Sequence, residues 1–264
     1  MKHWTLDDIA WEQFDRSKLR PELLSLVKAA CMVEHNGEDY ARYLCEVFHD
    51  DPEFQQAARD WAQEEVQHGQ ALRKWAEIAD PDFRFDQSFS DFTTGYKLPA
   101  GISTSVRGSR PGELVARCVV ESGTSTYYTA ISEYTDEPVL KQICAHIAAD
   151  EFRHYKLFYD HLRRYLKQEK MSIWARLRVA LGRVTESEDD ELAYAFYAAH
   201  TSGDTYDRKR YAKRYLSAVS RIYRRPHIER LAAMVLKAAG LKPNGRLGRA
   251  SGWLAWQVMR LRAA

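Results

Sequence analysis

Residues 61–69 read WAQEEVQHG, and residues 140–154 read LKQICAHIAADEFRH. Each stretch contains a glutamate three residues before a histidine: the pairs are Glu65 with His68 and Glu151 with His154. In an α-helix, positions i and i+3 lie on the same face about one turn apart, so both side chains of a pair can reach one point. The two stretches therefore predict two helices that each direct a carboxylate and an imidazole inward.

A second glutamate precedes each pair by a nearly constant interval. Glu34 lies 31 residues before Glu65, and Glu121 lies 30 residues before Glu151. This repeated spacing predicts two similar helical hairpins. Together they supply four carboxylates and two imidazoles, which is the ligand set of ferritin-like di-iron and di-manganese proteins. A network of buried salt bridges is the alternative interpretation.

Prolines, which are favoured in the first turn of a helix, mark where the long helices begin. The predicted helices span 21–49, 52–79, 111–135 and 138–168. Very short links join the first helix to the second and the third to the fourth, whereas residues 80–110, without sustained periodicity, connect the two hairpins. We expect an all-α, ferritin-like four-helix bundle in which two antiparallel hairpins are joined by a crossover.

Shorter helices are expected in the remainder of the chain, over residues 172–183, 188–200, 207–223, 226–240 and about 252–262. We expect residues 1–168 to form the bundle and residues 169–264 to form a helical extension packed on it. The four cysteines form no CxxC pair and have apolar neighbours, so buried free thiols are expected at Cys31, Cys45, Cys118 and Cys144.

Three further sequence features are candidates for additional ligands at the site. Glu38 lies one turn beyond Glu34 and is either an alternate ligand or, as we favour, an acid outside the ligand shell. His161 lies one heptad past His154, where a hydrogen-bonded histidine at the bundle end is favoured over a seventh ligand. Glu46-Val-Phe-His49 repeats the spacing but lies off the apolar face, so we expect it on the surface.

The two quoted stretches resemble the metal-binding helices of the soluble acyl-acyl carrier protein desaturases, which contain EENRHG and DEKRHE motifs. Glu121-Ser-Gly-Thr124 resembles that family's Glu-x-x-Thr, and Glu34 with Tyr40 resembles its glutamate and tyrosine six residues apart. The resemblance covers about residues 25–165. The chain is shorter than the plant enzymes, and it differs in the aromatic segment Ser125–Tyr128, whose tyrosines either narrow a substrate channel or, as we favour, fill the core.

This resemblance implies roles for individual residues. The implied iron ligands are Glu34, Glu65, His68, Glu121, Glu151 and His154. Trp61 and Asp150 match positions that the family uses near an iron-bound histidine, outside the ligand shell or in electron transfer. Thr124 matches a hydroxyl beside the oxygen-binding face and is a candidate proton relay; a threonine bonded to its own helix backbone is the alternative.

The expected function is that of an oxygen-dependent di-iron oxidoreductase acting on an unactivated C–H bond, namely an acyl-carrier-protein-linked fatty acyl desaturase or hydroxylase. The expected cofactors are two iron ions (Fe2+/Fe3+), with manganese as an alternative, and electrons come from an external donor. A rubrerythrin-like peroxidase or ferroxidase is the main alternative, and the absence of CxxC pairs counts against it. A non-catalytic metal-binding protein of the same fold is the third.

The formal net charge of +2 conceals an uneven distribution. Residues 161–264 carry 22 Lys and Arg against 9 Asp and Glu, a surplus of +13, which leaves −11 for residues 1–160. A basic face would attract acidic partners, so we expect acyl carrier protein, or another acyl thioester, as substrate and a ferredoxin-like electron donor. A homodimer is a further expectation. Nucleic-acid binding is not expected, because the basic residues are dispersed and no recognition motif is present.

The two ends of the chain bear on its location. No apolar run approaches the roughly 18 residues needed to span a membrane, and the amino terminus, MKHWTLDDIAWEQF, lacks the apolar stretch of a secretory signal. We therefore expect a cytoplasmic protein. Residues 246–262 combine Trp253 and Trp256 with arginines, and this segment either contacts a membrane surface peripherally or, as we favour, packs its apolar side chains on the bundle.

Overall fold

The computed structural model describes residues 3–99, 101–187, 191–200, 205–243 and 245–263. These residues form short 3₁₀ turns near the amino terminus, then α-helices and no β-strand, which confirms the all-α prediction. The helices are α1 (Pro21–His35), α2 (Gly37–Val47), α3 (Pro52–Ala79), α4 (Phe85–Gly95), α5 (Arg110–Tyr134), α6 (Pro138–Gln168), α7 (Ile173–Ser187), α8 (Glu191–Ala198), α9 (Arg208–Ile222), α10 (Arg225–Ala238) and α11 (Arg246–Ala263).

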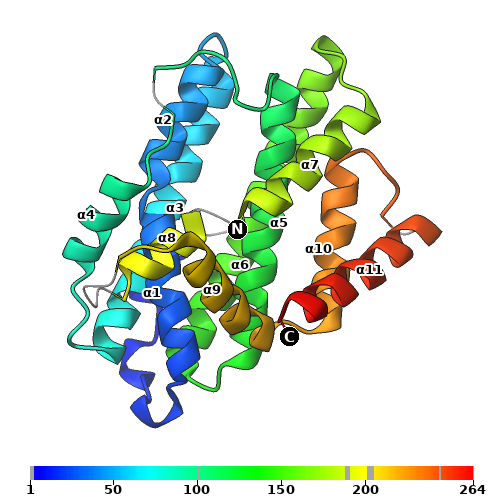
Figure 1. The fold of residues 1–264 in the computed structure, drawn as a ribbon. Helices are drawn as coiled ribbons and strands as arrows, with labels where there is room; N and C mark the ends of the chain where they lie inside the picture. The colour runs from blue at the N-terminus through cyan, green and yellow to red at the C-terminus, as the bar shows by residue number, and fades with distance from the viewer. Residues whose placement is uncertain (1–2, 100, 188–190, 201–204, 244, 264) are drawn as a thin grey trace.

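The centre of the molecule is a bundle of long helices (Figure 1). The α1–α2 segment packs against α3, α5 packs along α6, and α3 contacts α6, so the two predicted hairpins lie side by side. Each long helix begins with a proline in its first turn, as predicted. Side chains of Asp51, Ser109 and Glu137 accept hydrogen bonds from backbone N–H groups of the following turn, which stabilises the starts of α3, α5 and α6.

The prediction of one continuous helix over residues 21–49 was wrong, because the helix is interrupted at Asn36. Asn36 has φ −84° and ψ 12°, outside helical geometry, and α2 restarts at Gly37. A Cβ atom on Gly37 would lie 2.7 Å from the Cβ of Glu65, so the absence of a side chain lets the restart approach α3 closely. The interruption also changes which residues of α2 face inward.

The crossover between the hairpins contains a helix, α4, that the sequence analysis did not predict. Phe85, Phe89 and Phe92 follow helical spacing, and the rings of Phe85 and Phe89 are stacked 5.5 Å apart. Phe85 and Phe92 are buried, and α4 packs against α1 and α8. The phenylalanines therefore anchor a short helix within a segment whose other residues are mostly polar.

Two apolar clusters fill the core, one on each side of the predicted metal ligands. The first contains Leu72 and Ile147, and the second contains Phe54 and Phe158. The helices α3 and α6 run in opposite directions. The first cluster therefore follows the Glu-x-x-His pair on α3 and precedes the pair on α6, and the second cluster has the reverse placement. The ligands therefore occupy a polar layer across the middle of an otherwise apolar bundle.

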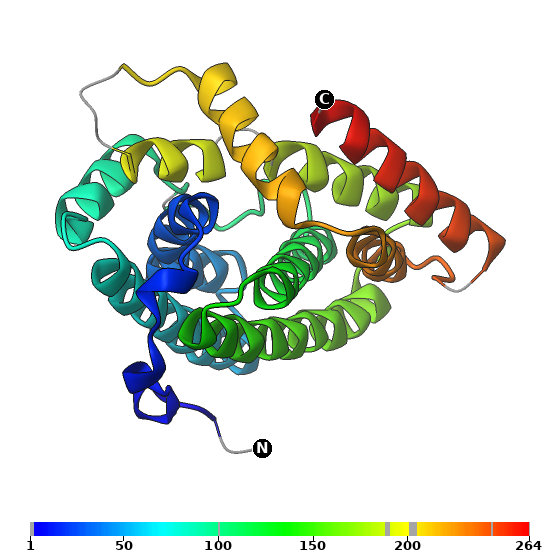
Figure 2. The ribbon, with the colours of Figure 1, turned by 90° about the horizontal axis from the view of Figure 1, so that it is seen from below.

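The chain ends cover opposite sides of the bundle (Figure 2). The amino-terminal segment lies against α3 and α6, where Trp4 and Ala10 are hydrogen-bonded to Gln67 and Gln142. The C-terminal helices lie on the other side, where α8 packs against α1 and both α7 and α10 pack against α5. The short C-terminal helices are thus present as predicted, although residues 188–190 lie outside the described residues.

The last helix, α11, packs only partly, contrary to the interpretation favoured above. Trp256 is half-buried, but Trp253, Leu254 and Leu261 are 51, 57 and 78% exposed. No helix among the described residues has the length and apolarity needed to cross a bilayer. Of the four free cysteines, Cys31, Cys118 and Cys144 are buried as predicted, whereas Cys45 is only half-buried.

Candidate metal centre

All six predicted ligands meet in the polar layer of the bundle, and each is at most 7% exposed. Their oxygen and nitrogen atoms fall into two groups, and the atoms within a group lie no more than 4.8 Å apart. The first group is Glu34, Glu65, His68 and Glu151, and the second is Glu65, Glu121, Glu151 and His154. Each group combines one imidazole with three carboxylates.

Glu65 and Glu151 belong to both groups, whereas Glu34 and Glu121 belong to one each. A carboxylate has two oxygens, so a residue common to two groups can bridge two ions. The histidines belong to different groups, and their ring centres lie 5.8 Å apart. The arrangement suits two adjacent metal ions bridged by Glu65 and Glu151, an assignment that the sequence spacing alone left open.

Both imidazoles direct Nδ1 toward the carboxylates. Nδ1 of His68 lies 3.4 Å from Glu151 and 3.7 Å from Glu34, and Nδ1 of His154 lies 3.0 Å from Glu65 and 3.8 Å from Glu121. Every one of the six residues has a buried ligand atom without a hydrogen-bond partner. Unpaired buried polar atoms are costly, and a bound cation would satisfy all six, so the residues fit a dimetal centre.

The pKa values of the glutamates reflect the crowding of negative charge. Burial, followed by the charge of Glu151, raises the pKa of both Glu65 and Glu121 well above the ordinary value. Burial also acts to raise the pKa of Glu34, but its interactions with Glu65 and His68 outweigh burial and lower the pKa. Without metal ions, the cluster therefore retains protons on some carboxylates.

Each histidine has a second acidic partner behind it, on the Nε2 side. Nε2 of His68 lies 3.1 Å from Asp150, and Nε2 of His154 lies 3.0 Å from Glu64. Burial acts to lower the pKa of both histidines, but these hydrogen bonds outweigh it and raise the pKa. Arg153 donates to both Asp150 and Glu64. An acid bonded to the outer nitrogen fixes the ring and makes the inner nitrogen a better ligand.

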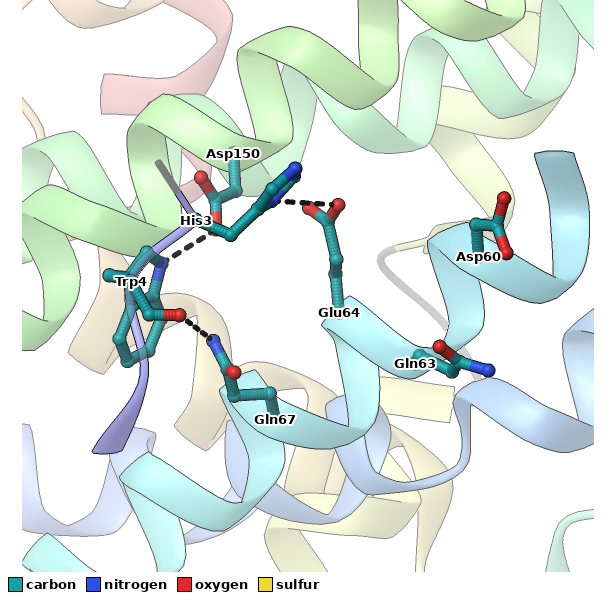
Figure 3. Close-up of a pocket in the computed structure, with 7 residues that line it drawn as sticks. All are labelled: His3, Trp4, Asp60, Gln63, Glu64, Gln67 and Asp150. Atoms are coloured by element: carbon teal, nitrogen blue, oxygen red, sulfur yellow. Dashed lines mark hydrogen bonds and ion pairs between the residues drawn. The ribbon is translucent and has the colours of Figure 1, made fainter. Parts of the chain in front are cut away.

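The amino-terminal segment adds an aromatic side chain to this outer layer. Trp4 donates its indole N–H to Asp150 at 2.7 Å, and its ring is parallel to that of His68 at 6.0 Å. A surface pocket of about 290 Å³ lies at this place. Figure 3 shows Trp4, Asp150 and Glu64 around it, together with His3 and Gln67. A chain of contacts thus leads from this pocket through Asp150 to His68.

Two hydroxyl groups contact the carboxylates from α5. Thr124 donates to Glu151 at 2.5 Å and also lies 3.3 Å from the backbone oxygens of Val120 and Glu121, so its hydroxyl contacts both a predicted ligand and its own helix backbone. Tyr128 donates to Glu34 at 2.5 Å. Tyr128 is therefore part of the polar layer rather than only a filler of the core.

Glu38 and Trp61 lie outside the two groups of ligand atoms. Glu38 is exposed, in keeping with the favoured interpretation of it as an acid outside the ligand shell rather than an alternate ligand. Trp61 lies edge-on to His154 at 6.4 Å and makes no hydrogen bond to the centre. His161 is hydrogen-bonded to Arg164 away from the cluster, and His49 is exposed, as predicted.

Sequence reasoning missed Glu64, Trp4 and Tyr128. Glu64 was recognisable, because Glu64-Glu65 and Asp150-Glu151 are the same acidic pair before each histidine. Tyr128 lies seven residues after Glu121 on the same helical face. The sequence therefore predicted that Tyr128 faces inward, but it did not predict the hydrogen bond to Glu34. Trp4 comes from a segment without periodicity, and only the folded chain places it against Asp150.

Comparison with protein families gives one match. The model of a fatty acid desaturase family matches residues 24–239, which include all six residues of the two ligand groups and the helices from α7 through α10. A search of curated proteins finds no match to the chain.

Proposed function

The chain belongs to the fatty acid desaturase family, and we propose from this premise that it is an oxygen-dependent di-iron oxidoreductase acting on an unactivated C–H bond of an acyl chain. The observation that carries the proposal is the pair of buried ligand groups that share Glu65 and Glu151. An acyl-carrier-protein-linked desaturase or hydroxylase is the specific activity that we propose.

Two iron ions would be held by Glu34 and His68 on one side, by Glu121 and His154 on the other, and by the shared carboxylates between them. Carboxylates with one imidazole per ion favour iron or manganese over zinc, which prefers four ligands in a tetrahedron. When bound, the iron pair supplies the oxygen-dependent oxidation of the C–H bond, with two electrons from an external donor. The apolar clusters on both sides exclude water from this layer.

The side chains around the ligands have distinct roles in this proposal. Asp150 and Glu64 hold the imidazoles in the orientation that directs Nδ1 inward. Thr124 can hold or pass a proton at its hydroxyl, which contacts Glu151. The contacts from Trp4 through Asp150 to His68 form the route that we propose for electrons entering from the surface, and this route includes Asp150, one of the two residues that the resemblance implied.

The first experiment measures iron in the purified protein. We expect about two iron ions per chain, loss of both in Glu65→Gln, and wild-type iron in the control Glu38→Gln, because Glu38 is an exposed acid of the same hairpin. A second matched pair is His68→Gln against His49→Gln. Equal iron in Glu65→Gln and in the wild type would contradict the assignment of the centre.

The second experiment tests the reaction by mass spectrometry of the fatty acids of cells that express the protein. We expect new unsaturated or hydroxylated chains with the wild type and none with Glu65→Gln. Unchanged fatty acids together with rapid peroxide turnover by the purified protein would instead support a rubrerythrin-like peroxidase.

We propose that an acidic partner, such as acyl carrier protein or a ferredoxin-like donor, binds at α9. This helix carries six Lys and Arg and no acidic residue. Arg210, Lys213, Arg214 and Arg221 line a shallow pocket of about 550 Å³ together with Phe196. Charge reversal in Lys213→Glu/Arg214→Glu should weaken carrier-protein binding at least tenfold at low salt, and equal binding by this variant would contradict the docking site.

The exposed face of α11 supports a different contact, with an anionic membrane surface. Trp253, Leu254 and Leu261 are exposed beside Arg249 and Arg260, a combination typical of interfacial helices. Wild-type protein should sediment with anionic but not neutral lipid vesicles, and Trp253→Ser/Leu254→Ser should not. The wild type could instead bind neither kind of vesicle and form a dimer, whereas Trp253→Ser/Leu254→Ser is a monomer. That result would mean that a second copy of the chain covers α11.

A further inference from the structure

Buried polar atoms without a hydrogen-bond partner form a second group outside the metal centre. They are Nε of Arg117, the hydroxyl oxygen of Tyr40 and the indole Nε1 of Trp61. These residues belong to α5, α2 and α3, and they are in contact: the guanidinium carbon of Arg117 lies 5.2 Å from the ring centre of Tyr40 and 5.8 Å from that of Trp61. We call these three residues the Arg117 cluster.

Arg117 makes no direct contact with an acidic side chain among the described residues. It is only 8% exposed, its Nε is buried without a hydrogen-bond partner, and its side chain forms no ion pair within the described ranges. Glu113, one turn before it, accepts hydrogen bonds from Tyr43 and Ser105, and Glu121, one turn after it, belongs to the metal centre. The cation–π contacts stabilise the charge of the guanidinium but provide no acceptor for its buried Nε–H.

The hydrogen-bonding chemistry of the cluster limits what can bind there. Guanidinium and indole groups can donate hydrogen bonds but cannot accept them, and the phenol of Tyr40 can do either. A ligand that satisfies all three must therefore present acceptors, and a carboxylate matches the charge and the fork geometry of arginine.

The surroundings of the cluster favour an apolar body on the ligand. Tyr40 and Trp61 belong to the second apolar cluster, with Leu44, Cys118 and Phe158. Trp61 also lies edge-on to His154, so the cluster is adjacent to one half of the metal centre. Leu98 and Ile102, from the segment after α4, are half-buried and pack on the same apolar cluster.

We propose that Arg117, Tyr40 and Trp61 bind the carboxylate of an apolar organic acid, whose hydrocarbon chain then lies beside the metal centre. The identification of this acid as the substrate rests on the proposed function. The binding of the acid at this site does not depend on the proposed function. The site would select acyl chains that carry a free carboxylate at the buried end over chains that end in a methyl group.

Calorimetric titration with octanoate tests the proposal directly, with 1-octanol as the neutral ligand of equal length. Octanoate should bind the wild-type protein more tightly than octanol does. It should bind at least tenfold more weakly to Arg117→Met, which keeps the side-chain length but not the charge, and several-fold more weakly to Tyr40→Phe. Octanol binding should change less than threefold in both variants.

Controls separate this site from the metal ions, which also bind carboxylates. Both variants should retain the wild-type iron content and far-ultraviolet circular dichroism. If Arg117→Met does not fold, the octanoate affinity of Tyr40→Phe alone tests the proposal. Equal octanoate affinity in the folded variants and the wild type would overturn the proposal, as would no binding to the wild type. A protein that binds octanoate through Arg117 but oxidises no acyl chain would contradict the proposed function alone.

Discussion

Nε2 of His154 lies 3.0 Å from a carboxylate oxygen of Glu64, the residue directly before Glu65, which belongs to both groups of candidate ligands. The other hairpin repeats the relationship, because Asp150, directly before Glu151, lies 3.1 Å from Nε2 of His68. Each ligand helix thus supplies the acid that orients the histidine of the other. The hydrogen bonds of Glu64 with His154 and of Asp150 with His68 therefore link α3 to α6 around the two groups of candidate ligands.

The first prediction concerns Glu64. Glu64→Gln should weaken iron binding by about 10- to 100-fold, since the acid that orients His154 is lost. Asp60→Asn is the control, because Asp60 lines the same surface pocket but is hydrogen-bonded, among the residues that the structure describes, only to Gln56. Competition with a chelator measures both affinities. Wild-type affinity in Glu64→Gln would show that the ring of His154 is held by packing alone.

The second prediction compares two glycines. A Cβ atom at Gly37 would lie 2.7 Å from the Cβ of Glu65, whereas one at Gly123, within α5, would meet nothing within 4 Å. Gly37→Ala should therefore reduce the free energy of unfolding by about 1–3 kcal/mol and weaken metal binding, because Glu65 must move. Gly123→Ala should stabilise the protein by up to about 1 kcal/mol through helix propensity.

Chemical denaturation and iron analysis of both variants test this comparison. Equal stability of Gly37→Ala and the wild type would mean that the junction at Asn36 shifts without moving Glu65. Destabilisation by Gly123→Ala would mean that the space beside Gly123 is filled when metal is bound.

The sequence predicted the bundle because its signals are local. Prolines mark the helix starts, and Glu-x-x-His repeats at matched intervals, so the long helices and the six residues that cluster between them followed from spacing. The failure at Asn36 concerns a place where two helices meet: the break lies where Gly37 packs closely against Glu65 on α3, and Glu38, just after it, is exposed.

Other features depend on which segments meet in space. The bonds from Trp4 to Asp150 and from Tyr128 to Glu34 join residues 146 and 94 positions apart, and no spacing rule predicts them. The isolation of Arg117 was equally hidden, since Glu113 and Glu121 lie one turn on either side of it and would ordinarily be taken as its partners.

The third prediction concerns protons that metal ions displace. Burial and the charge of Glu151 raise the pKa of Glu65 and Glu121, so the metal-free protein keeps protons there that binding must release. Metal affinity should therefore fall as the pH falls. Anaerobic titration with Mn2+ in buffers of different ionisation enthalpy should show net proton release, and smaller release in Glu121→Gln. Heats that are independent of the buffer would contradict this prediction.

The last prediction concerns Glu191, a buried acid at the start of α8. Burial, followed by the charge of Glu34, raises the pKa of Glu191 to about 8, whereas the ordinary value is 4.5. Between these values the folded protein keeps a proton that the unfolded chain has lost. The stability that this proton contributes is complete below about pH 4.5 and is lost as the pH rises through about 8.

Glu191→Gln removes the titration but keeps the shape of the side chain. The free energy of unfolding of this variant, relative to the wild type, should therefore rise between pH 5 and pH 8, by a total on the order of 4 kcal/mol. Denaturant titrations across this range measure the difference, and Glu38→Gln, at an exposed position, should stay within about 0.5 kcal/mol of the wild type. A constant difference between Glu191→Gln and the wild type would mean that Arg183, whose guanidinium lies 3.9 Å from Glu191, keeps the carboxylate ionised throughout.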